Sequence, residues 1–482
     1  RAEAVLVALL EGDLHTLKSD GTVVIVTEVG RDDVATDPVT GVDRGIVDRR
    51  GSSKIRVNNS LRRVLRTAIG TLTLTHPDPN RRLEAADAAF KSADPDQFEI
   101  LKTVLDGEQD RAVRTALSEA LAVSALAGDA ADESFKLAGI AILQSRGDQE
   151  AMAILRPIAE GDDPVLAPAA ADAVTAMEQS QRLWGLAQNV WFGLSLGSVL
   201  LLAAIGLAIT FGVMGVINMA HGELVMLGAY TTFAVQEAIR GSMPWLFDWS
   251  LLIAAPLAFL VAGGVGVAIE RGCVRYLYGR PLETLLATWG ISLILQQTVR
   301  SIFGPNNREV GNPSWMSGAF EIGQMTITYN RLWILIYSLT VFFVLLFVLK
   351  RTAIGLQMRA VTQNRPMAAD MGIRTGWVDA MTFGLGAGIA GLAGVALSQI
   401  DNVSPNLGQS YIVDSFMIVV FGGAGSIWGT LAAAFSLGIA NKFMEPWTGA
   451  VLAKILVLIF IILFIQKRPR GLFAVRGRAV DS

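Results

Sequence analysis

Residues 193–230 read GLSLGSVLLLAAIGLAITFGVMGVINMAHGELVMLGAY, and this stretch decides the fold. Residues 191–217, which include the first part of this stretch, carry no charged side chain. At 1.5 Å per residue it is long enough to cross the roughly 30 Å hydrocarbon core of a bilayer. His221 and Glu223 then interrupt the apolar sequence. The pattern predicts a membrane-spanning helix followed by a break.

Further apolar runs follow this stretch toward the C-terminus. Such runs are too long for the helices of a soluble core. We therefore predict an α-helical polytopic membrane protein with about six full crossings plus re-entrant or broken helices. The runs are 251–269, 332–349 and 451–465, together with 282–302 and 378–400, which carry polar residues.

The composition excludes several other classes of protein. Hydrophobic residues make up 52% of the 482 residues and charged residues 17%, with a mean hydropathy of +0.46. Residues 1–183 hold 30 acidic and 21 basic side chains, whereas residues 184–482 hold 13 and 19. A purely soluble, collagen-like or disordered chain is thereby excluded. A single cysteine, Cys273, cannot form an intramolecular disulfide, and with three histidines it argues against a structural zinc site.

This change of composition predicts two domains, 1–183 and 184–482. In the first domain we expect a small β-rich part at 15–60 and HEAT-like helices at 81–180, so that it is mostly α-helical. Residues 100–122 resemble residues 154–175, each with a helix, a glycine-acidic turn and a second helix. Plain amphipathic helices are the alternative. His15 and His76 are isolated, and we expect surface roles for both.

Basic residues in the loops predict the orientation in the membrane. Lys and Arg concentrate at 271–280, at 350–376 and in the tail after Gln466, which together hold 13 of the 19 basic residues of 184–482. These segments should be cytoplasmic, and so should the C-terminus. Helix parity then places residues 1–183 outside the cytoplasm. We expect a leader segment ahead of Arg1, or a truncated start.

Parity also requires residues 191–240 and 412–442 to cross an even number of times, or to cross once and return. Both contain polar or glycine-rich interruptions, at 218–224 and 421–429. Broken helices within a membrane are tolerated where they face protein or a water-filled cavity. Paired interruptions therefore predict a translocation path.

The candidate path residues come from three places in the chain. Ionisable residues within a membrane are functional hypotheses by default, and the N–H groups of a half-helix that starts near Asn218 could bind a polar substrate. Local capping of the helix by Asn218 is the alternative. Glycines at 422–425 could approach a ligand or allow tight helix packing, and polar residues at 296–300 could line a path or join helices. The candidates are Asn218, His221, Gly222, Glu223, Gln296, Gln297, Gly422, Gly423, Gly425 and Ser426.

Two other segments have simpler interpretations. Residues 351–375 could form an amphipathic helix that docks a partner or lies on the membrane, or a basic anchor for anionic lipid. Residues 383–397 place Gly384, Gly388, Gly391 and Gly394 at spacings that favour close helix contact. The chain contains no Gly-x-x-x-x-Gly-Lys-Ser/Thr phosphate loop.

Residues 190–470 resemble the permeases of the branched-chain amino acid class of ABC importers. The residues that carry the resemblance are those of 193–230, RAVTQNRPMAADMGI (359–373), FGGAGSIWGTLAAAF (421–435) and RPRGLF (468–473). In the front half, LKSDGTVVI (17–25), KIRVNNSLRR (54–63) and the alanine-rich helices resemble the extra N-terminal domain of the urea-transporting members, which plain branched-chain permeases lack.

The resemblance implies one subunit of a bacterial inner-membrane importer, with its N-terminal domain in the periplasm. Its expected partners are a second permease, two cytoplasmic ATP-binding subunits, a periplasmic substrate-binding protein and membrane lipid, with no nucleic acid. The chain itself is then no enzyme and holds no cofactor or metal, and ATP is used by the partners. The residues that match the family's ATPase-coupling segment are Arg359, Ala360, Asn364, Met367, Ala368 and Gly372.

Four interpretations of the function remain open on the sequence. A urea importer subunit leads, and an importer of branched-chain amino acids or short-chain amides is the first alternative. Neutral urea needs donors and acceptors, whereas an amino acid needs partners for its two charges, and His221 with Glu223 could serve either. An ATP-independent pore is disfavoured by the long coupling-type loop. An intramembrane enzyme is disfavoured because the carboxylates and histidines are few and scattered.

Overall fold

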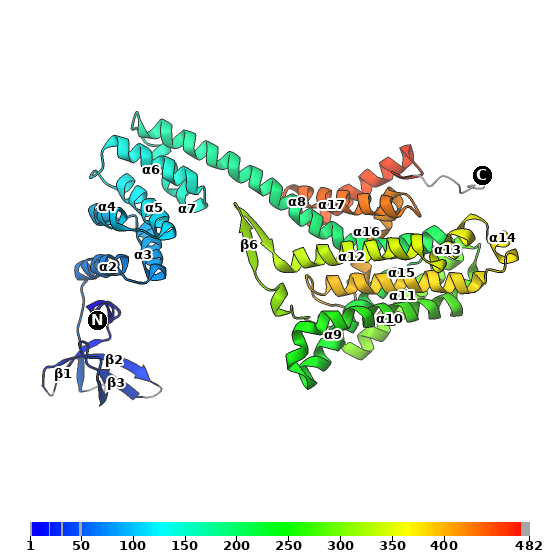
Figure 1. The fold of residues 1–482 in the computed structure, drawn as a ribbon, viewed down its shortest axis with the longest axis horizontal. Helices are drawn as coiled ribbons and strands as arrows, with labels where there is room; N and C mark the ends of the chain where they lie inside the picture. Colours follow the sequence, from blue (N-terminus) through cyan, green and yellow to red (C-terminus); the bar gives the residue numbers. More distant parts are fainter. Residues whose placement is uncertain (1, 19, 30–31, 48–50, 474–482) are drawn as a thin grey trace. The chain divides into compact units, whose positions relative to one another are not determined.

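The computed structural model describes residues 2–18, 20–29, 32–47 and 51–473. The basic residues Arg476 and Arg478, which contributed to the predicted orientation, lie outside the described residues. The chain divides into two compact units, Arg1–Arg182 and Leu183–Ser482. One long helix, α8 (Leu166–Met214), contains the boundary between them (Figure 1). Each unit is described by itself.

Unit 1 begins with a helix and a five-stranded antiparallel sheet of order β4-β3-β2-β1-β5. Alternation of side chains across the sheet buries Val24 and Ala35 completely. In register, Leu14 lies opposite Ile25, which itself lies opposite Thr36 on the next strand. The elements are α1 (Ala2–Glu11), β1 (Leu14–Leu17), β2 (Val23–Val29), β3 (Asp32–Thr36), β4 (Asp43–Ile46) and β5 (Ser52–Lys54).

The rest of unit 1 is helical, as the sequence predicts for most of the front half. Aspartate side chains cap the starts of α3, α5, α6 and α7 by accepting backbone N–H groups. The pairs α4–α5 and α7–α8 each contain a helix, a short turn and a second helix, and the HEAT-like assignment stays a prediction. The helices are α2 (Asn59–Leu74), α3 (Pro79–Ser92), α4 (Phe98–Gly107), α5 (Arg111–Ala127), α6 (Glu133–Arg146) and α7 (Gln149–Ala159).

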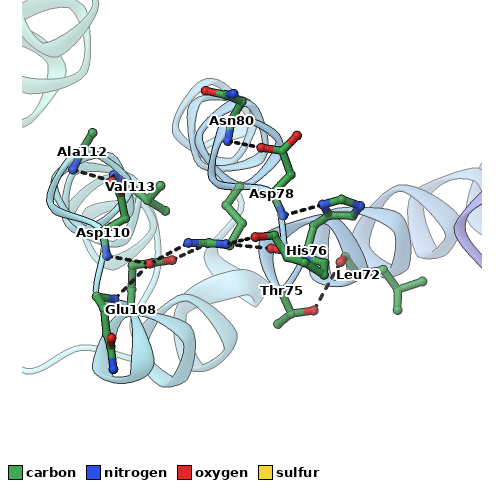
Figure 2. A network of polar contacts seen from close by, with 12 residues as sticks. Leu72, Thr75, His76, Asp78, Asn80, Glu108, Asp110, Ala112 and Val113 are labelled. Atoms are coloured by element: carbon green, nitrogen blue, oxygen red, sulfur yellow. Dashed lines mark hydrogen bonds and ion pairs between the residues drawn. The ribbon is translucent and has the colours of Figure 1, made fainter.

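A polar network joins the α2–α3 turn to the α4–α5 turn (Figure 2). The Arg82 guanidinium donates to both carboxylate oxygens of Glu108, at 2.7 and 2.9 Å, and to the carbonyls of His76 and Pro77. Glu108 also accepts from the backbone N–H of Asp110. These hydrogen bonds, that from Arg82 first, lower the pKa of Glu108 below its ordinary 4.5.

Unit 2 is the membrane part of the chain. Within the described residues, five helices are long and apolar enough to cross a membrane. The expected count of about six crossings stays a prediction, since α9 and α11 are 22 and 23 residues long but fall outside these five. The five are α8, α10 with the preceding turn (Pro244–Gly272), α12 (Tyr329–Arg351), α15 (Thr375–Leu397) and α17 (Ile427–Lys467).

Helices α9, α10 and α15 pack against one another within unit 2. Glycines bring their backbones together. A Cβ on Gly228 would lie 2.6 Å from the Gly391 Cα, and one on Gly391 would lie 2.5 Å from the Ala258 carbonyl oxygen. The small-residue pattern of 383–397 therefore serves close helix contact, as the sequence indicates. The central helices run over His221–Ser242 (α9), Ser250–Gly272 (α10) and Thr375–Leu397 (α15).

The remaining elements of unit 2 include one that the sequence reading passed over, a two-stranded antiparallel hairpin of β6 and β7. Helix α17 contains a kink at Gly449, which has a φ of +78° and divides the helix into two parts. The elements are α11 (Pro281–Phe303), β6 (Ala319–Ile322), β7 (Met325–Thr328), α13 (Ala353–Gln363), α14 (Arg365–Asp370) and α16 (Leu407–Gly422).

Candidate translocation site

The predicted interruption at 218–224 overlaps a break between α8 and α9, but the structure begins the break earlier, at 215, and has residues 221–224 already in α9. Helix α8 ends at Met214, Gly215 has a φ of +70°, and α9 begins at His221. The His221 ring Nε2 lies 2.7 Å from the carbonyl oxygen of Ala203, eleven residues before the end of α8. Residues 215–220 therefore run back along α8 without helical structure. Such irregular backbone is tolerated at membrane depth only against protein or water.

The polar side chains of the break and of the first turn of α9 are fully enclosed within unit 2. Asn218, His221 and Glu223 are each at most 1% exposed. The Asn218 side-chain oxygen accepts from the Ala220 N–H at 3.0 Å, a local turn just ahead of α9, and no side chain in the described part of the chain caps the first N–H groups of that helix. Glu223 accepts from the Ser292 hydroxyl at 3.1 Å.

Each of these three side chains retains one buried polar atom without a hydrogen-bond partner. The atoms are Asn218 Nδ2, His221 Nδ1 and Glu223 Oε2. Burying a polar atom unpaired is costly, and such groups in a native protein call for an explanation. Together they offer a donor, a ring nitrogen and an acceptor from one six-residue stretch. Such a set can bind a small polar molecule with both donors and acceptors.

Helix α11 supplies the opposite wall of this site. Thr288 accepts from the Met219 N–H at 3.1 Å, and Ser292 donates to Glu223. Thr284, Thr288, Ser292 and Gln296 are all buried and follow one another at intervals of four residues. They form a polar stripe along α11, which we call the α11 stripe. Its first three members were not among the predicted site residues, although the interval of four is present in the run 282–302.

The stripe continues to the end of α11, where the two predicted glutamines separate. Gln296 donates to the Asn406 side-chain oxygen at 2.7 Å, and Arg300 donates to the same oxygen at 3.0 Å. Gln296 is 8% exposed, whereas Gln297 is exposed and lies off the stripe. The structure thus brings Gln296 into the row that faces α9 and leaves Gln297 outside it.

The glycine segment 422–426 makes close backbone contacts rather than contacts with Asn218 or Glu223. The Leu472 N–H donates to the Phe421 carbonyl and the Phe473 N–H to the Gly422 carbonyl, at 2.9 and 3.1 Å. A Cβ on Gly423 would lie 2.6 Å from the Phe473 carbonyl oxygen. Gly425 packs on Gly212 of α8, and Ser426 caps α17. These contacts favour the packing interpretation of the segment.

The predicted coupling segment forms two short helices, α13 and α14. Arg359, Asn364, Met367 and Gly372 are exposed, whereas Ala368 is 5% exposed and packs inward. Ala360 is half-buried. Gly372 adopts a φ of +86° at the turn after α14. Four of the six predicted residues are therefore accessible to a docking partner.

A buried group of side chains fixes α14 to the membrane helices. Arg365 pairs with Asp379 of α15, whose side chain is fully buried, and stacks over Tyr278 at 4.7 Å from the ring centroid. Tyr278 donates to Glu270 of α10 at 3.1 Å. One arginine thus ties the exposed segment to α15 and, through Tyr278, to α10. The sequence analysis did not single out these residues.

The described part of the chain has no cluster of three or more His, Cys, Asp or Glu side chains suited to a metal ion. The polar groups instead follow a broken helix and the α11 stripe between membrane-length helices. These features define a polytopic membrane protein of the transport class.

Comparison with known proteins identifies the family. Residues 189–465 match the family model described as "Branched-chain amino acid transport system / permease component". The chain belongs to this family of ABC-importer permeases. The match lies within the membrane part and includes no residue of unit 1.

Three similar proteins carry descriptions of the same kind of permease. The chain is 31% identical over 293 residues to the high-affinity branched-chain amino acid transport system permease protein LivH of Salmonella typhimurium, covering 59% of this chain and 94% of the relative. It is 30% identical to the corresponding permease protein BraD of Pseudomonas aeruginosa, and the alignment covers 59% of this chain and 94% of BraD. It is 24% identical to a probable LivH of Methanocaldococcus jannaschii, and the alignment covers 58% of this chain and 89% of that protein. No solved structure matches the chain.

Proposed function

We propose that this chain is the permease subunit of an ATP-driven urea importer, of the UrtB type. The membership in the branched-chain amino acid permease family supports the transport role, and the front domain supports the narrower substrate. The LivH and BraD relatives align over 94% of their own length but over only 59% of this chain. Their unaligned remainder is too short for a counterpart of Arg1–Arg182. That extra unit is the observation on which the urea assignment rests.

The chemistry of the site is compatible with urea. Urea is neutral, with amide donors and a carbonyl acceptor, so that it needs hydrogen-bonding groups rather than a charge pair. Asn218 Nδ2, His221 Nδ1 and Glu223 Oε2 offer such groups without partners of their own. A branched-chain amino acid is the second candidate, because the LivH relatives carry that description. An ammonium group can also pair with Glu223, so these polar groups do not distinguish the two substrates and the choice of urea rests on unit 1.

The proposed path follows the break and the α11 stripe, with Asn218, His221, Gly222 and Glu223 on one side and Gln296 on the other. The exposed Gln297 is left out of the path, and the glycine segment with Ser426 acts through packing. The path is completed by a second permease, and a periplasmic binding protein delivers the substrate. The chain itself needs no cofactor.

The proposed energy source is ATP, used by two cytoplasmic ATP-binding subunits. These dock on the exposed residues of α13 and α14, and their closure moves the segment. Arg365 passes the movement to α15 and, through Tyr278, to α10, and both helices pack directly on α9. Alternating access results when the two arrangements of these helices exchange.

Uptake in cells tests the proposal. A host without its own urea importer carries the chain with its genomic neighbours, and labelled urea is supplied at micromolar concentration. We expect uptake that stops when ATP is depleted and is unaffected by excess leucine or short-chain amides. Competition by leucine would replace urea with an amino acid as substrate, and uptake without ATP would favour a pore.

A front-domain deletion tests the role of unit 1. A protein that lacks unit 1, is expressed normally and loses uptake would assign this unit to docking the binding protein. Unchanged uptake would exclude both docking of the binding protein and stabilisation of the assembly as essential roles of unit 1.

A further inference from the structure

The second half of α17, residues 450–467, contacts the rest of unit 2 through a narrow row of side chains. Its buried side chains are Ala453, Val457 and Ile461, at intervals of four residues. Of the five membrane-length helices it has the smallest buried share, 17% of its most apolar window. The rest of the helix surface is apolar and exposed. Lipid could cover such a surface, except for one charged residue.

Lys454 lies within this apolar helix and is half exposed. Its Nζ is 2.9 Å from Oδ2 of Asp414 on α16 and 5.9 Å from the Tyr411 ring centroid. Asp414 is 5% exposed and lies near the middle of α16, seven residues after Leu407 and eight before Gly422. At 1.5 Å per residue the pair is on the order of 10 Å from either end of α16.

A half-exposed ammonium on this apolar helix is costly against lipid. Charged side chains within a membrane almost always face other protein or water, or extend toward the interface. The ion pair with Asp414 holds the Lys454 head group beside α16 and so prevents that extension. The adjoining surface of α16 is also polar, because Gln409 and Ser410 are exposed one turn before Asp414.

We propose that this α16–α17 surface around Lys454 is where the second permease subunit packs. The partner surface should be largely apolar, to cover the exposed face of α17, and should place a hydroxyl, carbonyl or carboxylate oxygen beside the free side of the Lys454 ammonium. The inference rests on the proposed pairing of two permeases, and it deepens that proposal by assigning the pairing to α16 and α17.

Spin labelling tests this surface in the complete importer. In a Cys273→Ser background, a nitroxide is attached at Val451→Cys or Leu458→Cys, which flank Lys454 on the same helix face. The matched control is Leu260→Cys on α10, a residue 65% exposed in the middle of another membrane helix. Spectra are recorded for the chain alone and for the importer with its partners, both in vesicles.

We expect assembly to immobilise the labels at 451 and 458 and to lower their collision rate with oxygen several-fold, while the label at 260 does not change. Loss of partner co-purification for the labels at 451 and 458, but not 260, would also support the interface. Labels at 451 and 458 that stay mobile and oxygen-accessible would overturn it, as would access to a water-soluble nickel chelate. Urea uptake measured on the same samples keeps this result separate from the substrate assignment.

Discussion

The contact between α9 and α15 gives the sharpest quantitative prediction. Gly228 of α9 packs directly on the backbone of Gly391, where an alanine Cβ would lie 2.6 Å from the Gly391 Cα. Ordinary contacts of this kind are 3.4–4 Å, so the helices must separate by about 0.8 Å or more. Neither side of the contact has a flexible side chain that could move away.

Overpacking of this kind costs about 1–3 kcal/mol. The gain in helix propensity from glycine to alanine offsets at most about 1 kcal/mol. We therefore expect Gly228→Ala to lower the thermal midpoint of the detergent-solubilised protein by about 2–3 °C, because a unit of this length shifts by about 1.6 °C per kcal/mol. Because α9 carries the broken segment, urea uptake should fall as well.

Gly290→Ala is the matched control for this change. Gly290 lies in α11, a 23-residue helix of the same unit, and a Cβ there has no neighbour within 4 Å. Its thermal midpoint should stay the same or rise slightly. Equal midpoints for the two variants, measured by fluorescence-detected size exclusion after heating, would refute the packing argument.

Three further changes test the site, the coupling segment and unit 1. Glu223→Gln should reduce uptake while assembly stays intact, since the variant loses a carboxylate buried beside Ser292; normal transport by a well-expressed variant would remove Glu223 from the path. Gly372→Pro should abolish substrate-stimulated ATP hydrolysis, because proline cannot adopt the φ of +86° found at this position. The control Gly372→Ala should have a smaller effect. Unchanged stimulation in the proline variant would contradict the docking assignment. Glu108→Gln should destabilise the protein at neutral pH. The folded-state pKa of Glu108 is lowered by Arg82, so this stabilisation is present above the ordinary pKa of 4.5 and is lost as pH falls. Unfolding curves of variant and parent should converge in acid, and a constant gap would refute the role of the pair.

The sequence predicted those features that follow from hydrophobic length and local breaks. The uncharged run 191–217 specified the end of α8, and the polar residues after it specified the break, because neither depends on distant partners. The glycine spacing of 383–397 likewise indicated close helix contact. The family resemblance of the membrane half is confirmed by the match over residues 189–465.

Other features depend on which helices meet, and a single sequence does not contain that information. Ser292 becomes part of the site only because α11 faces Glu223, and Arg365 becomes an anchor only because Asp379 and Tyr278 surround it. Lys454 was passed over within an apolar run, although a lysine in such a run is itself a signal. Gln297 was grouped with Gln296, but one residue along a helix turns a side chain by about 100° to another face.

Transport by purified components tests the central claim most directly. The chain, its partner permease, the ATP-binding subunits and the binding protein are reconstituted in liposomes, and labelled urea and labelled leucine are offered separately with and without ATP. The account predicts that urea accumulates only with ATP and that leucine does not accumulate. The account would be contradicted if leucine accumulated with ATP while urea entered no faster than it enters empty liposomes.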